Sequence, residues 1–268
     1  MIQNRSYSFA ALALVAAAGS AAFAIGDIST VNSVKVESRL FNDFPTSSLT
    51  ITNNFPTLLN FNESIQQDEP GGFANKHVGW LSNDGGTTRF QNNYWQSWSL
   101  NFTVQIDSPN GLPRKEAGID VRNPRPRLGY VDEGQVLIAS DGEVAVFGGV
   151  MPFIGLGNVY TRGTTASVQF NYYAPGVVDP TKGAIELIFT DAVTGVHNSG
   201  LKIWGNESDG LFGFNDGAEF GLKDQNAFNN FIADSANVAY GNVGIVPSPA
   251  GLGVLALGGL MASRRRRA

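Results

Sequence analysis

The sequence predicts an all-β protein that folds as an antiparallel β-sandwich. Three observations support this prediction. Apolar and polar residues alternate in about a dozen short segments, glycine-containing turn dipeptides separate those segments, and no long amphipathic helix is evident. A strand that buries one face and exposes the other requires such alternation, and two sheets of such strands can bury their apolar faces against each other.

The clearest strand is expected from Tyr94 to Asp107. Even-numbered residues from Trp98 to Ile106 are all apolar, and odd-numbered residues from Ser97 to Asp107 are all polar. This period of two indicates one buried and one solvated face. Shorter alternating segments lie at residues 34–37, 168–172 and 185–189.

The clearest hairpin joins residues 135–139 to residues 143–147 through Ser140, Asp141 and Gly142. Glycine allows the positive φ that such tight turns need. Three segments look least like strands, and the last of them has room for one short helix. These segments cover residues 60–74, 109–127 and 224–236.

The chain is expected to have three parts. Residues 1–24 resemble a secretory signal peptide, because an apolar stretch follows Arg5 and ends in the A-x-A pattern of a cleavage site at Ala22-Phe23-Ala24. Residues 25–245 are long enough to bury one sizeable core. No internal repeat, charge block or proline-rich linker divides them, so we interpret them as a single β-sandwich domain.

Residues 246–268 form the third part. The stretch up to residue 263 carries no charge, and its length is near the lower limit of roughly 17 to 20 residues for a membrane-spanning helix. In a bilayer such a helix satisfies its own backbone polar groups, and positive charges that follow it stay on the cytoplasmic side. We therefore expect a short transmembrane segment that is held in the inner membrane by Arg264, Arg265, Arg266 and Arg267.

The order of features in this tail resembles the PEP-CTERM sorting signal of exported proteins from bacteria with a Gram-negative type of envelope. A proline motif comes first, then a hydrophobic segment, then the arginine cluster. A serine stands here in place of the glutamate that usually separates the two prolines. The resemblance implies cleavage near the proline motif by an exosortase, a membrane transpeptidase-like protease, and therefore export to the cell envelope, the cell surface or the medium. The motif consists of Val246, Pro247, Ser248 and Pro249.

The composition excludes several classes of function. Of the 18 Lys and Arg residues, five lie in the two terminal parts, so 13 remain against 23 Asp and Glu residues. A body this acidic repels phosphate backbones, so nucleic acid is not an expected partner. The chain has no cysteine, which excludes disulfides, thiolate metal sites and cysteine nucleophiles.

The number and size of the strands resemble a concanavalin A-like lectin or glucanase sandwich, or a related jelly roll. Glucanases with such sandwiches carry an E-x-D-x-E strand whose outer acids perform the chemistry. The nearest match runs from Glu116 to Asp120, with Gly118 at the middle position. We interpret these acids as solvated beside neighbouring basic residues, which in turn pair with acids elsewhere or contact anionic polysaccharide. The basic cluster consists of Arg114, Lys115, Arg122, Arg125 and Arg127.

Other candidate site residues are few. His77 and His197 are the only histidines, and both are interpreted as surface or loop residues. Trp95 and Trp204 are expected on the polar faces of their strands, where a sugar ring could stack on them. Two short loops gather oxygen ligands of the kind that calcium prefers, although turn formation alone also explains their composition. These loops cover residues 206–210 and 215–219.

Taken together, these observations favour a non-enzymatic, exported surface or extracellular-matrix protein whose activity the sequence does not establish, with carbohydrate binding as the candidate function. No cofactor is expected, with calcium left open as the alternative. The expected partners are an exosortase, the inner membrane before processing, and extracellular polysaccharide. Two other functions stay open: a carbohydrate-active hydrolase, which requires two carboxylates facing each other across a groove, and a purely structural matrix component.

Overall fold

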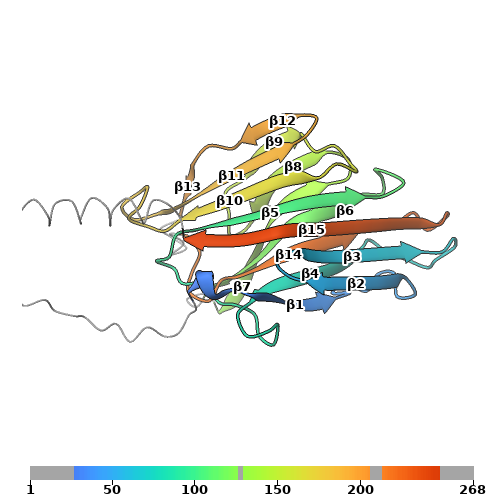
Figure 1. Cartoon of the computed structure of the whole chain (residues 1–268), viewed down its shortest axis with the longest axis horizontal. Helices are drawn as coiled ribbons and strands as arrows, with labels where there is room; N and C mark the ends of the chain where they lie inside the picture. Colours follow the sequence, from blue (N-terminus) through green and yellow to red (C-terminus); the bar gives the residue numbers. More distant parts are fainter. Residues whose placement is uncertain (1–26, 126–128, 206–212, 248–268) are drawn as a thin grey trace, which may run out of the picture.

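Two antiparallel sheets pack face to face in the computed structural model, which describes residues 27–125, 129–205 and 213–247 (Figure 1). The protein is an all-β sandwich, which confirms the predicted fold class. Within these ranges one sheet has seven strands. In spatial order its strands are β1 (Ser33–Ser38), β4 (Asn75–Ser82), β14 (Glu219–Asn226), β6 (Lys115–Arg125), β7 (Tyr130–Ala139), β8 (Glu143–Gly148) and β9 (Ile154–Asn158).

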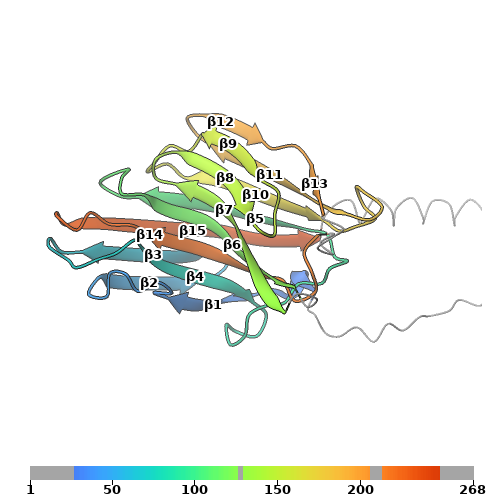
Figure 2. The same cartoon turned by 180° about the vertical axis from the view of Figure 1, so that it is seen from behind.

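The second sheet has eight strands in the described ranges, and a 3₁₀ turn, η1 (Ile28–Thr30), precedes β1. Figure 2 shows the sandwich from behind, with β6 to β9 of the seven-stranded sheet toward the viewer. In spatial order the eight-stranded sheet contains β12 (Gly195–Asn198), β11 (Gly183–Asp191), β10 (Ala166–Tyr173), β5 (Trp98–Asp107), β15 (Asp234–Pro247), β3 (Leu58–Ile65) and β2 (Ser48–Asn54), while β13 (Lys202–Trp204) also pairs with β11.

The alternation predicted for β5 is confirmed, because all five even-numbered residues from Trp98 to Ile106 are buried. The expected start of this strand was wrong. Tyr94 and Trp95 form a turn instead, in which Asp216 accepts the Tyr94 N–H at 2.7 Å. Trp98, the first residue of the strand after this turn, is fully buried, and its ring lies 4.7 Å from the ring of Phe220 on the opposite sheet.

Each of the segments that looked least like strands contains strand residues. β3 covers part of residues 60–74, β6 covers much of residues 109–127, and β14 and β15 occupy both ends of residues 224–236 without a helix between them. Polar residues that face the interior interrupt the alternation of apolar and polar residues by which strands are predicted from sequence. Lys115, for example, is fully buried and forms an ion pair of 2.6 Å with Asp234.

The predicted hairpin is confirmed. β7 ends at Ala139, β8 begins at Glu143, and the turn between them places Gly142 at φ 104°. The Gly142 N–H donates to the Ala139 carbonyl at 2.9 Å and closes the turn. A residue with a side chain is disfavoured in this backbone conformation, which explains the glycine.

The tail and the leader fall largely outside the described residues. These parts include the expected signal peptide, Ser248, Pro249, the expected membrane segment and Arg264 to Arg267. Val246 and Pro247 of the expected sorting motif are described, and they end β15 opposite Ser99 and Trp98. In the described ranges, no helix has the length and apolar character to cross a membrane.

Tyr240 of β15 connects the two sheets. Its hydroxyl accepts the Gly118 N–H at 2.7 Å, lies 3.1 Å from the Gly118 carbonyl and also bonds to the Lys223 carbonyl. Gly118 has φ 127°, and a Cβ atom there would lie 1.9 Å from the Val136 carbonyl oxygen. The glycine therefore allows β6 to turn its backbone toward the tyrosine.

Tyr240→Phe should lower the free energy of unfolding by about 1–3 kcal/mol, because it leaves buried backbone groups of β6 and β14 without their partner. The half-buried Tyr173, whose hydroxyl lies 3.3 Å from Glu186, is the matched control. Tyr173→Phe should change the stability by less than about 0.5 kcal/mol. Equal effects of the two substitutions in urea denaturation would contradict a cross-sheet role for Tyr240.

Candidate functional site

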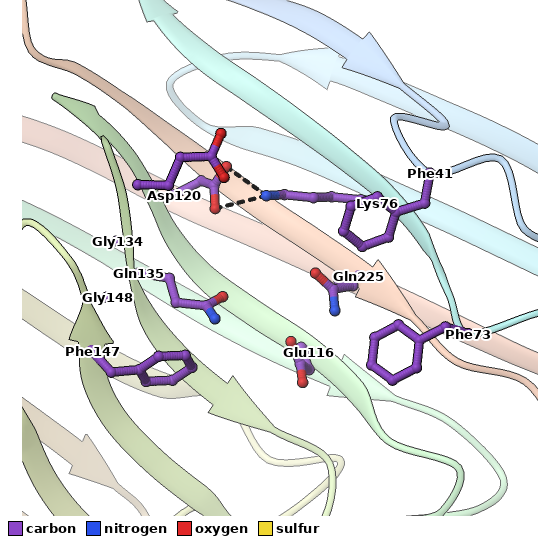
Figure 3. A pocket seen from close by; sticks show the side chains of 11 residues that line it. Phe41, Phe73, Lys76, Glu116, Asp120, Gly134, Gln135, Phe147, Gly148 and Gln225 are labelled. Atoms are coloured by element: carbon purple, nitrogen blue, oxygen red, sulfur yellow. Dashed lines mark hydrogen bonds and ion pairs between the residues drawn. The ribbon is translucent and has the colours of Figure 1, made fainter. Parts of the chain in front are cut away.

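An open groove of about 410 Å³ crosses the outer face of the seven-stranded sheet from β4 to β8 (Figure 3). Strands lie about 4.8 Å apart, so the groove spans about 19 Å of sheet. We call it the outer groove. Its lining residues are Phe41, Phe73, Lys76, Glu116, Asp120, Glu133, Gly134, Gln135, Phe147, Gly148 and Gln225.

Phenylalanine rings stand on both sides of the outer groove. Phe147 extends from β8 on one side, while Phe41 and Phe73 extend from the β1–β2 and β3–β4 loops on the other. Phe41 and Phe73 are 49% and 70% exposed, which is unusual for two large apolar side chains beside one groove. A second depression of about 470 Å³ shares Phe73, Glu116 and Gln225, and it extends the surface toward Arg114.

The floor of the outer groove is polar, and its charged side chains form ion pairs with one another. Lys76 on β4 forms an ion pair of 2.8 Å with Asp120, and Lys223 on β14 forms one of 3.0 Å with Glu116. Lys223 also donates to the side-chain amide of Gln135. Burial lowers the pKa of Lys223, and the Glu116 carboxylate only partly offsets burial.

Strand register explains why these groups meet. Lys223 lies opposite Gly118 of β6, and its Nζ bonds to Glu116 on β6 and to Gln135 on β7. Gln225 lies between Lys76 and Glu116 in the ladder, and its side-chain amide has no hydrogen bond within the described residues. The floor therefore offers an amide to a ligand between two neutralised ion pairs.

The sequence interpretation of the acids on β6 was wrong in one respect. Glu116 and Asp120 are half-buried and buried, respectively, and each is paired with a lysine rather than solvated. The basic residues around them pair with acids elsewhere, which is the first of the two interpretations from sequence: Arg114 with Asp141 and Glu143, Lys115 with Asp234, and Arg122 with Glu219. The side chains of Arg125 and Arg127 lie outside the described part of the chain.

The two tryptophans proposed from sequence behave differently. Trp95 is 68% exposed, but it lies in the turn before β5, outside the outer groove, with its ring 4.6 Å from that of Tyr94. The expectation for Trp204 was wrong. Its ring packs 5.2 Å from Phe214 and 6.1 Å from Tyr172, against the core, while Lys202 and Ile203 of β13 are exposed.

The expectation for His77 was also wrong, because it is fully buried on β4 and its ring stacks on Phe61. His197 lies on the edge strand β12, where its Nε2 contacts the Thr194 hydroxyl at 3.1 Å. Of the two loops considered for calcium, residues 206–210 lie outside the described residues. In the other, the Asp216 carboxylate accepts the Tyr94 N–H and the Asn215 side chain donates to the Pro124 carbonyl.

A second polar group lies inside the sandwich, and sequence reasoning missed it. Glu63, His77 and Asp224 are fully buried, and one potential ligand atom from each lies within 4.8 Å of the others. Together with Asn75 and Asn226 we call them the buried polar cluster. The signal that could have revealed it is a pair of polar residues at alternate positions near one end of each strand, on the face that otherwise packs into the core. These pairs are Asn75 and His77 in β4, and Asp224 and Asn226 in β14.

Hydrogen bonds hold Glu63 as an ionised carboxylate. Its Oε1 accepts from Ser47 and Asn75, both at 2.6 Å, and its Oε2 lies 3.0 Å from His77 Nε2. Burial raises the pKa of Glu63, whereas the hydrogen bonds from His77, Ser47 and Asn75 lower it. Burial and the Glu63 carboxylate raise the pKa of Asp224.

Comparison with known proteins gives only remote similarity. No protein-family model matches the chain, and no curated protein matches it in sequence. A family 7 alginate lyase in complex with its substrate is 7% identical, with a TM-score of 0.47, over 83% of this chain and 95% of that chain. The PL-14 alginate lyase of Aplysia kurodai is 8% identical, with a TM-score of 0.43, over 81% and 99%.

A lectin-like protein is similarly distant. Arcelin-5 of Phaseolus vulgaris, a lectin-like defense protein, is 11% identical, with a TM-score of 0.45, over 80% of this chain and 100% of that chain. Structural similarity at this level gives no information about the site. The assignment as a β-sandwich rests on the strand pairing of this chain itself.

The pair formed by Lys76 and Asp120 should contribute more than an exposed pair does. Their side chains are only 11% and 8% exposed, whereas those of Lys35 and Glu37, 3.6 Å apart, are 39% and 24% exposed. In a double-mutant cycle with alanine, the coupling energy should be about 1–2 kcal/mol for the first pair and below about 0.5 kcal/mol for the second. The same coupling for both pairs in thermal or urea unfolding would argue against a fixed groove floor.

Proposed function

We propose that this protein binds carbohydrate without altering it chemically, and that the outer groove is the binding site. The observation that most supports this proposal is the combination of exposed phenyl rings on the groove walls with amide and charged groups on its floor. A pyranose ring has an apolar face that packs on aromatic side chains, whereas its hydroxyl groups need hydrogen-bonding partners. The outer groove supplies both within one open surface.

The charges of the groove favour a neutral glycan. The two lysines at the groove already bind Asp120 and Glu116, and the remaining acid, Glu133, lies 3.9 Å from Arg122. An anionic polysaccharide would have to displace these partners before it could use either lysine. Binding should therefore depend on ring stacking and amide hydrogen bonds, and it should change little with salt concentration.

The same ion pairs favour binding over hydrolysis. A hydrolase needs one carboxyl group that donates a proton and a second one that attacks or activates water. Glu116 and Asp120 lie on one strand, and each is held by a lysine, so neither is poised as a free acid or base.

Phe73→Ala should weaken glycan binding at least about tenfold, since it removes a 70% exposed ring from the groove wall and about 1.4 kcal/mol corresponds to that factor. The measurement is a glycan array to find a ligand, followed by calorimetric titration of wild type and variant. Phe153, which is 75% exposed but does not line the outer groove, is the matched control.

Phe153→Ala should leave the affinity unchanged. Loss of binding in Trp95→Ala, with Phe73→Ala unaffected, would move the site to the turn before β5. Absence of any glycan ligand at millimolar concentration would contradict carbohydrate binding and favour the purely structural alternative.

We also propose that the chain is exported and sorted by an exosortase. The support is the sequence of the two terminal parts. The mature form would then lack residues 1–24 and the segment after the proline motif.

Mass spectrometry of the protein isolated from its native host should give a chain that begins at Ile25 and ends near Pro249. The control is the same host with its exosortase inactivated, in which the C-terminal segment should be retained. Recovery of the unprocessed chain from the soluble lysate of the normal host would refute export.

A further inference from the structure

The interior of the sandwich holds two carboxylates with no matching positive charge. Glu63 on β3 and Asp224 on β14 are both fully buried. The nearby lysines are used elsewhere: Lys115 forms its ion pair with Asp234, and Lys223 points to the outer groove. Ionised carboxylates in protein interiors are normally paired with a cation or bound to a metal.

His77 does not supply the missing charge. The Arg39 N–H donates to His77 Nδ1 at 3.0 Å, so Nδ1 acts as an acceptor and carries no proton. The proton of this neutral imidazole is therefore on Nε2, which donates to Glu63 at 3.0 Å. Nε2 has no free lone pair in this tautomer, so His77 orients Glu63 and is not a metal ligand. The Arg39 guanidinium itself donates to the carbonyls of Phe44 and Pro45.

Two oxygens of the buried polar cluster lack a partner within the described part of the chain. They are Asp224 Oδ1 and Asn226 Oδ1, and both residues are fully buried. A buried acceptor without a donor is strongly unfavourable.

The amide of Asn226 lies between the two carboxylates. Its Nδ2 donates to Asp224 at 3.0 Å and to Glu63 at 3.3 Å. The nitrogen and oxygen of an amide have nearly the same size, so a rotation by 180° would direct Oδ1 at both carboxylates. Three oxygens would then point at one position. Their partial negative charges repel one another unless a cation lies between them.

We propose that a calcium ion binds in the buried polar cluster between Glu63, Asp224 and Asn226. Its two positive charges balance the two carboxylates, and all three ligands are hard oxygen donors. Calcium accepts bidentate carboxylates and irregular geometry, whereas Mg²⁺ demands a near-octahedral shell. This site is separate from the loop at residues 215–219 and from the outer groove.

The test uses the purified full-length chain, stripped with EDTA, with and without 1 mM CaCl₂. Elemental analysis after dialysis should find one calcium per chain, and calcium should raise Tm by about 5 °C. Mg²⁺ at the same concentration should raise it less. Asp224→Asn keeps the shape but removes one buried charge, so this variant should be at least as stable as wild type in EDTA and should bind calcium at least tenfold more weakly.

Asp216→Asn, in the loop before β14, is the matched control and should keep the full response to calcium. The proposal is overturned if wild type neither binds calcium nor gains stability from it. It is also overturned if Asp216→Asn abolishes the response while Asp224→Asn keeps it, because calcium would then bind in the loop. Glycan binding by the outer groove is measured separately, so either proposal can fail without the other.

Discussion

The alternation of side chains along β14 is the constraint on which both polar sites depend. Lys223 and Asp224 are adjacent and both fully buried, yet they lie on opposite faces of the strand. Lys223 faces outward to Glu116, while Asp224 faces inward, opposite His77 of β4. A shift of one residue in register would place the ammonium group in the interior and the carboxylate in the groove. Backbone ladders to β4 and β6 on both edges of β14 fix the register against such a shift.

The interior also positions the walls of the outer groove. Asn75 of the buried polar cluster accepts the Phe44 N–H at 3.0 Å and donates to the Phe44 carbonyl at 3.2 Å. The Asp43 carboxylate accepts the Ala74 N–H at 3.0 Å, which ties the β1–β2 loop to the start of β4. His77 holds the end of β1 through the Arg39 N–H. The loops that carry the two exposed phenylalanines are therefore attached to the cluster beneath them, so a change in its charge or packing would reach the groove.

The parts of the fold that the sequence predicted are those where one face of a strand is wholly apolar. β5 and the β7–β8 hairpin meet this condition. β6 and β14 do not, because Lys115, Asp224 and other polar residues occupy inward positions that only their partners across the sandwich make tolerable. His77 looked like a surface residue for the same reason. Trp204 belongs to a three-residue strand, which is too short for its alternation to show which face meets the core. Its contact with Phe214 shows that its ring packs against the core. The outer groove draws its walls from three separate segments, so no local pattern could reveal it.

The two ends of β15 lie at opposite ends of the sandwich. Asp234, where β15 begins, pairs with Ile65, the last residue of β3, and the loop after Ile65 carries Phe73 of the groove wall. Pro247, where β15 ends, pairs with Trp98 at the other end of the sheet (Figure 1). Fourteen residues of strand, about 45 Å at 3.3 Å per residue, separate these two points. In the sorted form that we propose, the site of attachment follows Pro247 in the chain, whereas the loops of the groove wall lie near the opposite end of β15. With the attachment after Pro247, the proposed glycan site and the proposed anchor would use opposite ends of the same strand.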